Sequence, residues 1–343
     1  MNEERLILAL AIHRAFGLKS REKERVFEAV RTPDEYSRFS LDDLAVCSKR
    51  PLSFRSWSSR ESLDAAERDY RICRALDIRP VGVWEAGYPP LLRETWDPPF
   101  MVFVRGRAPD PDKPALAAVG TRSADNEALN AAWRLGFDAG KNAIPLISGL
   151  AAGVDSAAHR GAVDCRVPTF AILGCGIDSV YPAAHRTLAA RMIDSGGGLL
   201  SEYPPGFPAL RHHFPERNRI IAGLARWVAI IQAPRRSGAL ITAEYALDCG
   251  RDLVVHAVGV RDGEQNDGTR ALAGDGAPVI SCCGDLPGIA PEFAEGPRAE
   301  DEQPAVSGGG SGKSAHTSDV AALLARRLDR ELGLREKEPA YGT

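Results

Sequence analysis

Apolar residues recur along the chain with two different periods, and the change of period divides the sequence. Up to about Asp77 they return every three or four positions, as Leu6, Ala9 and Ile12 do, and this spacing predicts amphipathic helices. The run Ser40-Leu41-Asp42-Asp43 adds a helix-capping signal. We therefore expect a small all-α domain over residues 1–77.

From residue 115 onward, short apolar runs alternate with helical patterns. The expected strands are 115–119, 144–147, 169–173, 199–201, 227–231, 253–258 and 278–281. The expected helices between them are 126–137, 156–163, 184–193, 218–224 and 241–249. Strands that alternate with helices in this way are typical of a parallel sheet covered by helices on both faces. We expect an α/β fold, a doubly wound and mostly parallel sheet, over residues 115–284.

Three further segments surround these two domains. Residues 78–114 are rich in proline, glycine and aromatics and end in an apolar run, so we expect a connecting segment that ends in a strand. Residues 285–319 read as a flexible linker, and residues 320–343 as a short helical tail. The run 307–314 approaches the Walker A pattern, but no strand precedes it, and we interpret it as linker.

Composition narrows the class of protein. The 343 residues suggest roughly two domains, and 44% hydrophobic with 26% charged residues is typical of a soluble globular chain. No apolar run approaches the ~20 residues that span a bilayer, and no signal or transit peptide is readable, so a cytoplasmic protein is expected. The net charge of -3 means that any site for a polyanion must be a local patch.

The seven cysteines are odd in number and contain no Cys-x-x-Cys motif. This pattern favours reduced thiols over a disulfide framework or a zinc site. The adjacent Cys282 and Cys283 are the one pair in which redox chemistry would be sought.

Small residues cluster where expected strands end and helices begin. Three such turns are 120–123, 148–155 and 174–178. In a doubly wound sheet they lie at the carboxyl edge, where main-chain N–H groups at helix starts attract phosphate. The turn Gly174-Cys175-Gly176 has Ser179 where a dinucleotide fingerprint needs its third glycine, which disfavours NAD binding. Phosphate binding and a purely structural role for the tight turns remain the alternatives.

A basic cluster lies between residues 201 and 236. It contains Arg211, Arg217, Arg219, Arg226, Arg235 and Arg236 against Glu202 and Glu216, with His212, His213 and Phe214 among them. Arginine forks bind phosphates and an aromatic ring stacks on a base, so the cluster suits single-stranded nucleic acid. A solvated basic face is the alternative. The turn 235–242 adds another possible anion site at the same edge.

Candidates for catalysis are few. Asp155 and His159 are one helical turn apart, but a helix cap and a packed, hydrogen-bonded histidine are the favoured roles. Glu202 and Glu244 are the other candidate carboxylates. No metal-ligand spacing and no Ser-His-Asp pattern is present, so we expect no enzyme, no cofactor and no metal.

Two motifs of the α/β region are highly specific: the run Arg217-Asn218-Arg219-Ile220-Ile221 and the turn Ser237-Gly238-Ala239-Leu240-Ile241-Thr242. With them come the segments 88–91, 97–99, 119–122, 148–155, 158–159, 173–178 with Tyr181-Pro182, 200–206, 214–224 and 237–242. In these segments, over residues 88–280, the chain resembles the DNA-processing protein A (DprA, also called Smf) family. Departures are Gln232, where the family has an acid, Val258, where it has proline, and Arg270, where it has asparagine.

The resemblance implies an extended Rossmann-like domain preceded by a SAM-like helical domain. It implies a homodimer, without membrane contact, that binds single-stranded DNA, protects incoming DNA and loads RecA recombinase in natural transformation. The residues that it assigns to DNA are Arg122, Ser148, Gly149, Arg211, Phe214, Arg217, Asn218, Ser237 and Gly238. A nucleotide phosphoribohydrolase on the same fold is the enzymatic alternative, although Glu244 has the wrong spacing for it. A nucleotide-sensing module is the third alternative.

Overall fold

The structure, a computed structural model, describes residues 1–52 and 57–289. The linker expected at 285–319 is described only up to residue 289. The tail expected at 320–343 and the glycine-rich run 307–314 lie outside the described residues. Within the described residues, no helix is both long and apolar enough to cross a bilayer.

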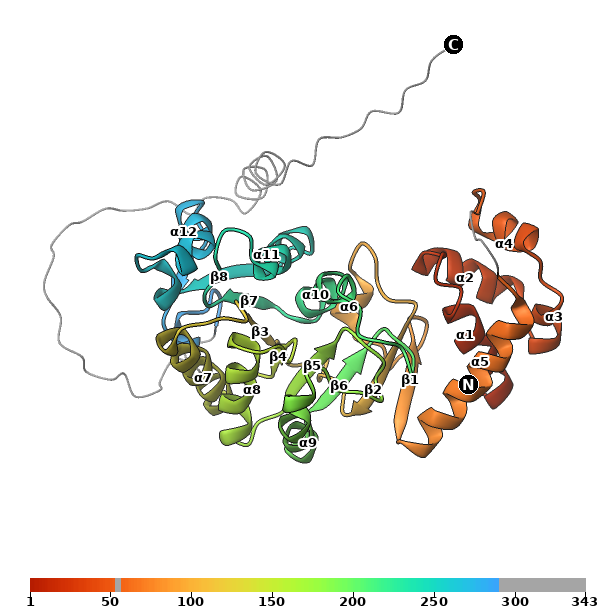
Figure 1. Cartoon of the computed structure of the whole chain (residues 1–343), viewed down its shortest axis with the longest axis horizontal. Helices are drawn as coiled ribbons and strands as arrows, with labels where there is room; N and C mark the ends of the chain where they lie inside the picture. Colours follow the sequence, from red (N-terminus) through yellow and green to blue (C-terminus); the bar gives the residue numbers. More distant parts are fainter. Residues whose placement is uncertain (53–56, 290–343) are drawn as a thin grey trace, which may run out of the picture.

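In the described part of the chain, a nine-stranded sheet runs through the molecule (Figure 1), with the order β1-β2-β6-β5-β4-β3-β7-β8-β9. Its strands are β1 (Ile78–Gly82), β2 (Met101–Gly106), β3 (Leu116–Val119), β4 (Leu146–Ser148), β5 (Thr169–Leu173), β6 (Gly198–Ser201), β7 (Trp227–Ile230), β8 (Asp252–His256) and β9 (Val279–Ile280). The strands from β6 to β9 in this order are parallel. The predicted α/β fold with a doubly wound, mostly parallel sheet is confirmed.

The segment between the two expected domains belongs to the sheet. β1 and β2 pair with each other, and β2 pairs with β6, in both cases antiparallel. β1 was not predicted as a strand because it contains Pro80. A proline is tolerated there because β1 is an edge strand, on which one row of N–H groups has no neighbouring strand.

Helices cover both faces of the sheet (Figure 1). On one face lie α7 (Asn126–Lys141), α8 (Val154–Asp164) and α9 (Arg186–Asp194). On the other lie α6 (Pro90–Arg93), α10 (His213–Leu224) and α11 (Gly238–Asp248), and α12 (Asp267–Gly274) follows β8. Two apolar clusters fill the space between the sheet and these layers: α10, α11 and α12 contribute to one, α7 and α8 to the other.

The amino-terminal helices form the expected all-α unit. They are α1 (Glu3–His13), α2 (Ser20–Ala29), α3 (Pro33–Ser37), α4 (Leu41–Ser48) and α5 (Ser59–Ala75). Ser40 caps α4 in a capping box with Asp43, as the sequence predicted. The unit is not separate from the sheet, because buried residues of α1, such as Leu10, belong to the same apolar cluster as Phe103 of β2 and Phe100 just before it.

The chain reverses its direction across the sheet twice. From β2 it crosses to β3 and adds β4, β5 and β6 back toward β2, then it returns to place β7 on the other side of β3. Residues 202–226 make this crossover and carry α10. The helix begins at His213, five residues before the predicted start at 218. Pro215 lies in its first turn, where the missing N–H of proline costs no helical hydrogen bond.

The strand predicted at 253–258 ends early. β8 stops at His256, and residues Ala257–Val260 form a short 3-10 helix. The cause is local: His256 Nδ1 accepts a hydrogen bond of 3.1 Å from the N–H of Val258 and caps the turn.

Candidate nucleic-acid interface

The carboxyl edge, meaning the ends of β3, β4, β5 and β7, gathers residues from distant parts of the sequence. Arg122 follows β3, and its guanidinium lies 5.2 Å from the ring centre of Phe214 on α10. Tyr181 follows β5, and its ring lies 5.4 Å from the same phenylalanine. Phe214 also lies over Gly174, where a Cβ would come within 3.0 Å of the ring. The structure therefore forms a half-buried aromatic platform with a cation beside it.

The turn after β4 is fixed by a buried arginine. Arg217 is 3% exposed, and its Nη1 donates hydrogen bonds to the carbonyl oxygens of Gly149, at 2.9 Å, and Ile172. A Cβ at position 149 would lie 2.6 Å from Arg217 Nη2 and 2.7 Å from Asp155 Oδ2. A larger residue at 149 would therefore have to displace the guanidinium of Arg217 or the carboxylate of Asp155.

Asp155 completes the turn, although not as predicted. The amino-terminal cap of α8 is Gly153, so the expected capping role of Asp155 is wrong. Its carboxylate instead accepts hydrogen bonds from the N–H groups of Gly149, at 3.1 Å, and Ala151, at 3.4 Å. Because its short side chain lies in the first turn of the helix, it reaches back to the loop rather than to the helix end.

Asp155 and Arg217 offset each other electrostatically. Burial lowers the pKa of Arg217 to about 10, while the nearby carboxylate of Asp155 acts in the opposite sense. Burial raises the pKa of Asp155, and Arg217 acts against that rise. The charge of Arg217 is therefore balanced inside the protein. The positive potential at the edge must come from the exposed arginines.

Ser148 and His159 are wholly buried beneath the edge. The hydroxyl of Ser148 donates to the carbonyl of Ala118 at 2.6 Å and ties β4 to β3. His159 Nδ1 lies 2.7 Å from the hydroxyl of Thr169, and burial lowers the pKa of His159 to about 3. The prediction of a packed, hydrogen-bonded histidine is confirmed.

The remaining predicted residues extend the edge toward α11. Asn218 Nδ2 donates to the carbonyl of Gly238 at 3.2 Å and joins α10 to α11. Ser237 caps α11, accepting from the N–H of Ala239 at 3.3 Å, and the space beside Gly238 is open. Arg211 is exposed on the loop before α10. Asn218, Ser237 and Gly238 thus continue the edge, while no contact ties Arg211 to it in the described part of the chain.

Gln232 is a structural residue that the sequence marked only as a departure. It is wholly buried after β7, and its amide donates to the carboxylate of Asp125 at 2.6 Å and to Asn266 at 2.9 Å. It also accepts from the N–H of Asp125 at 3.1 Å. An acid here would face the carboxylate of Asp125, so the amide suits this chain. The sequence feature that could have identified Gln232 is a polar residue at the end of an otherwise apolar strand.

The other departures have simple places. Val258 is buried in the turn after β8. Arg270 pairs with Asp262 at 2.7 Å and with Asp267 at 2.9 Å on the surface around α12.

The described residues offer little support for a metal-binding site or a reactive cysteine. They contain no group of three or more potential ligand side chains placed to hold a metal ion. The cysteines are free thiols, and burial raises the pKa of Cys283 well above its usual range, which disfavours a reactive thiolate.

The fold and this edge define an α/β protein of the doubly wound class whose strand ends present small-residue turns, arginines and an aromatic ring. The model of the family described as DNA recombination-mediator protein A matches residues 79–287, and the chain belongs to this family.

Two relatives illustrate the similarity. The DNA processing protein DprA of Streptococcus pneumoniae is 38% identical over 194 residues, which are 57% of this chain and 68% of the relative. Its X-ray structure covers 80% of this chain and 94% of the solved one, with a TM-score of 0.63 at 30% identity. A structure of DNA processing protein A from Helicobacter pylori, reported for its single-stranded DNA binding mode, has a TM-score of 0.53 at 26% identity and covers 59% and 90% of the two chains.

Proposed function

We propose that this protein binds single-stranded DNA at the carboxyl edge of its sheet. The observation that carries the proposal is the platform of Phe214 with Arg122 beside it, because a ring stacks on a base while an arginine grips the neighbouring phosphate. The open main chain around Gly238, at the start of α11, offers a further phosphate contact. The DNA-binding relative from Helicobacter pylori supports the same ligand class.

Within this proposal, the predicted site residues divide by burial. Arg122 and Arg211 are exposed, and Phe214 is half-buried, so these three would touch the strand. Ser148, Gly149 and Arg217 would act as positioning residues that shape the turn after β4. Asn218, Ser237 and Gly238 would hold the start of α11 toward the phosphates.

We expect the wild type to bind a fluorescent oligo-dT more tightly than a matched duplex, with an affinity that falls as salt rises. Arg122→Ala should remove about one unit from the slope of log affinity against log salt, since one phosphate contact is lost. Phe214→Ala should weaken binding by about 1–3 kcal/mol, the range measured for base stacking. Fluorescence anisotropy across a salt series measures both effects.

Arg134→Ala is the matched control, because Arg134 is exposed on α7 and the variant loses the same charge. It should bind like the wild type. Equal losses in Arg134→Ala and Arg122→Ala would mean that only overall charge matters and would refute the site.

We further propose that the protein is a non-enzymatic homodimer that protects the strand and loads a RecA recombinase. In this role, it should stimulate the DNA-dependent ATPase of RecA on a strand covered by single-strand-binding protein. Arg122→Ala, which grips the strand less well, should stimulate less. Absence of stimulation by a wild type that binds the strand would reject the loading role and leave DNA binding intact.

A further inference from the structure

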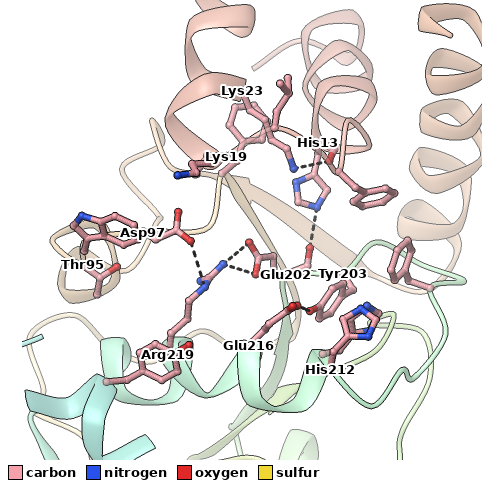
Figure 2. A pocket seen from close by; sticks show the side chains of 18 of the residues that line it. His13, Lys19, Lys23, Thr95, Asp97, Glu202, Tyr203, His212, Glu216 and Arg219 are labelled. Atoms are coloured by element: carbon pink, nitrogen blue, oxygen red, sulfur yellow. Dashed lines mark hydrogen bonds and ion pairs between the residues drawn. The ribbon is translucent and has the colours of Figure 1, made fainter. Parts of the chain in front are cut away.

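A large cavity lies where the amino-terminal helices meet the crossover, away from Arg122 and its turn. Its volume is about 940 Å³, and Figure 2 shows it between α1 and α2 above and α10 below. We call it the interdomain pocket; its lining includes His13, Ser20, Lys23, Tyr203 and Arg219. Cavities of this size commonly bind small molecules.

The floor of the pocket carries hydrogen-bonding groups that the protein does not use. Lys23 is 7% exposed, and Nζ donates to the carbonyl of His13 at 2.8 Å, which occupies one of its three N–H groups. In the described part of the chain, the donors Ser20 Oγ and Arg219 Nη1 are buried without a partner. His13 Nδ1 is also buried without a partner, but it is an acceptor, because Nε2 donates to the carbonyl of Glu202 at 2.8 Å. Burying a donor without a partner destabilises the fold. Ser20, whose side chain is 9% exposed, and Arg219 both line the cavity, and their unused donors point to a missing acceptor.

The walls of the pocket are aromatic. Phe16 and Phe207 have ring centres 4.7 Å apart, and Tyr203 stacks on His213 at 4.1 Å. Phe16 is 50% exposed and Trp96, which also lines the pocket, is 81% exposed. Rings left open on a cavity wall suit a planar ligand.

The charged side chains of the pocket differ between its buried floor and its exposed rim. Arg219 binds the carboxylate of Glu202 through Nη2, at 2.6 and 2.7 Å, and lies 3.7 Å from that of Asp97. These acids are therefore engaged, as Figure 2 shows. Glu216 and Asp248 are exposed at the rim, where Glu216 accepts from the hydroxyl of Tyr203 at 3.2 Å. The floor thus offers donors and the rim offers acceptors.

The protonated amine of Lys23 is disfavoured by its burial. Burial lowers the pKa of Lys23 to about 8, with Glu202 acting in the opposite sense and Arg219 in the same sense. An anion beside the amine would relieve that cost, because an opposite charge favours the protonated form.

We propose that the interdomain pocket binds a nucleotide, with the phosphate against Lys23 and Ser20, the base between the aromatic walls, and its amino group toward Glu216 and Asp248. A free nucleotide and one nucleotide unit of a bound strand share this chemistry. Binding of a nucleotide unit within a strand rests on the proposed function, because His213 in the pocket wall directly precedes Phe214 at the carboxyl edge. Binding of a free nucleotide does not depend on the proposed function.

The test is calorimetric titration of the full chain with dAMP, with deoxyadenosine and with inorganic phosphate. dAMP should bind more tightly than either fragment. Ser20→Ala should keep the thermal stability of the wild type, because the hydroxyl has no partner to lose, and should weaken dAMP about fivefold. Lys23→Met should weaken dAMP about tenfold or more. Lys141→Met, at the end of α7, is the control and should bind dAMP normally.

A parallel titration with oligo-dT identifies the source. If Ser20→Ala and Lys23→Met lose dAMP but keep the strand, the pocket takes a free nucleotide. If they lose both, the strand itself enters the pocket. If the wild type binds dAMP but not oligo-dT, the proposed DNA interface is rejected and the proposed nucleotide pocket is supported. No binding of dAMP by the wild type, or binding indifferent to both variants, overturns the inference.

Discussion

Buried polar side chains at the carboxyl edge are bonded mainly to main-chain groups. Arg217 holds the carbonyls of Gly149 and Ile172, and Ser148 holds that of Ala118. His159 bonds to Thr169, which in turn donates to the carbonyl of Leu146 at 3.0 Å. Because the hydroxyl proton of Thr169 is used in this way, His159 must donate from Nδ1. The ring is neutral near pH 7 because burial lowers the pKa of His159 to about 3.

Acidification should destabilise the protein through His159. Its pKa is about 3 in the fold, against about 6.5 in an unfolded chain, so the unfolded state binds the proton more readily. The stability contributed by the neutral ring is complete above about pH 6.5 and is lost as the pH falls from there toward 3. Between about pH 7.5 and about pH 5 the loss should be about 2 kcal/mol.

Urea unfolding of the wild type and of His159→Asn at these two pH values measures that loss. The asparagine amide lies where Nδ1 lies in histidine, so it retains a donor for Thr169 but does not titrate. The difference in unfolding free energy between the two pH values should be about 2 kcal/mol smaller in the variant. Identical pH dependence in the two proteins would show that another group is responsible.

Among the elements, α7 and α8 are in unusually close contact. A Cβ at Gly136 of α7 would lie 2.1 Å from the carbonyl oxygen of Ala158, and one at Gly161 of α8 would lie 1.9 Å from that of Trp133. Each glycine therefore faces the backbone of the opposite helix. This contact sets the position of α8, and with it the turn that carries Gly149 and Asp155.

Gly161→Ala should destabilise the protein by about 1–3 kcal/mol, the usual cost of overpacking, although alanine is the better helix former. Chemical denaturation measures the change. Gly274→Ala at the end of α12 is the control, because nothing lies within 4 Å of the position its Cβ would take. It should be neutral or slightly stabilising. Stabilisation by Gly161→Ala would mean that the helices separate easily.

At the scale of the whole molecule, the helical unit and the sheet share one continuous core. Leu10 of α1 lies in the same apolar cluster as Phe103 of β2 and Leu199 of β6. His13 of α1 adds a polar contact between the two parts, because its Nε2 donates to the carbonyl of Glu202, just after β6, at 2.8 Å. The two parts should therefore unfold together.

Calorimetry should show a single unfolding transition for residues 1–289. Leu10→Ala in the helical unit and Leu200→Ala in the sheet each leave a cavity at a fully buried site. Each should reduce the free energy of unfolding in that single transition by about 2–5 kcal/mol. Two transitions, each sensitive to only one substitution, would show that the units fold independently.

Features set by interactions between residues near in sequence could be predicted, and features set by contacts between distant residues could not. Strand and helix periodicity is local, so the parallel sheet and the turns at its edge could be predicted. β1 was missed because Pro80 is acceptable only at an edge, and edges are set by the whole sheet. The burial of Arg217 depends on α10 returning over β4, and the interdomain pocket joins Lys23 to Arg219 across nearly two hundred positions. Spacing along the chain carries no signal for either.

The start of α10 has two neighbouring rings that face different surroundings. His213 stacks on Tyr203 in the wall of the interdomain pocket, while Phe214 receives Arg122 at the carboxyl edge. A ligand that fixes one ring also restricts the backbone of the other. By thermodynamic linkage, whatever factor a pocket ligand applies to the affinity for the strand, the strand applies to the affinity for that ligand. The first turn of α10 thus connects the two sites through adjacent residues, so that occupancy of one site can affect binding at the other.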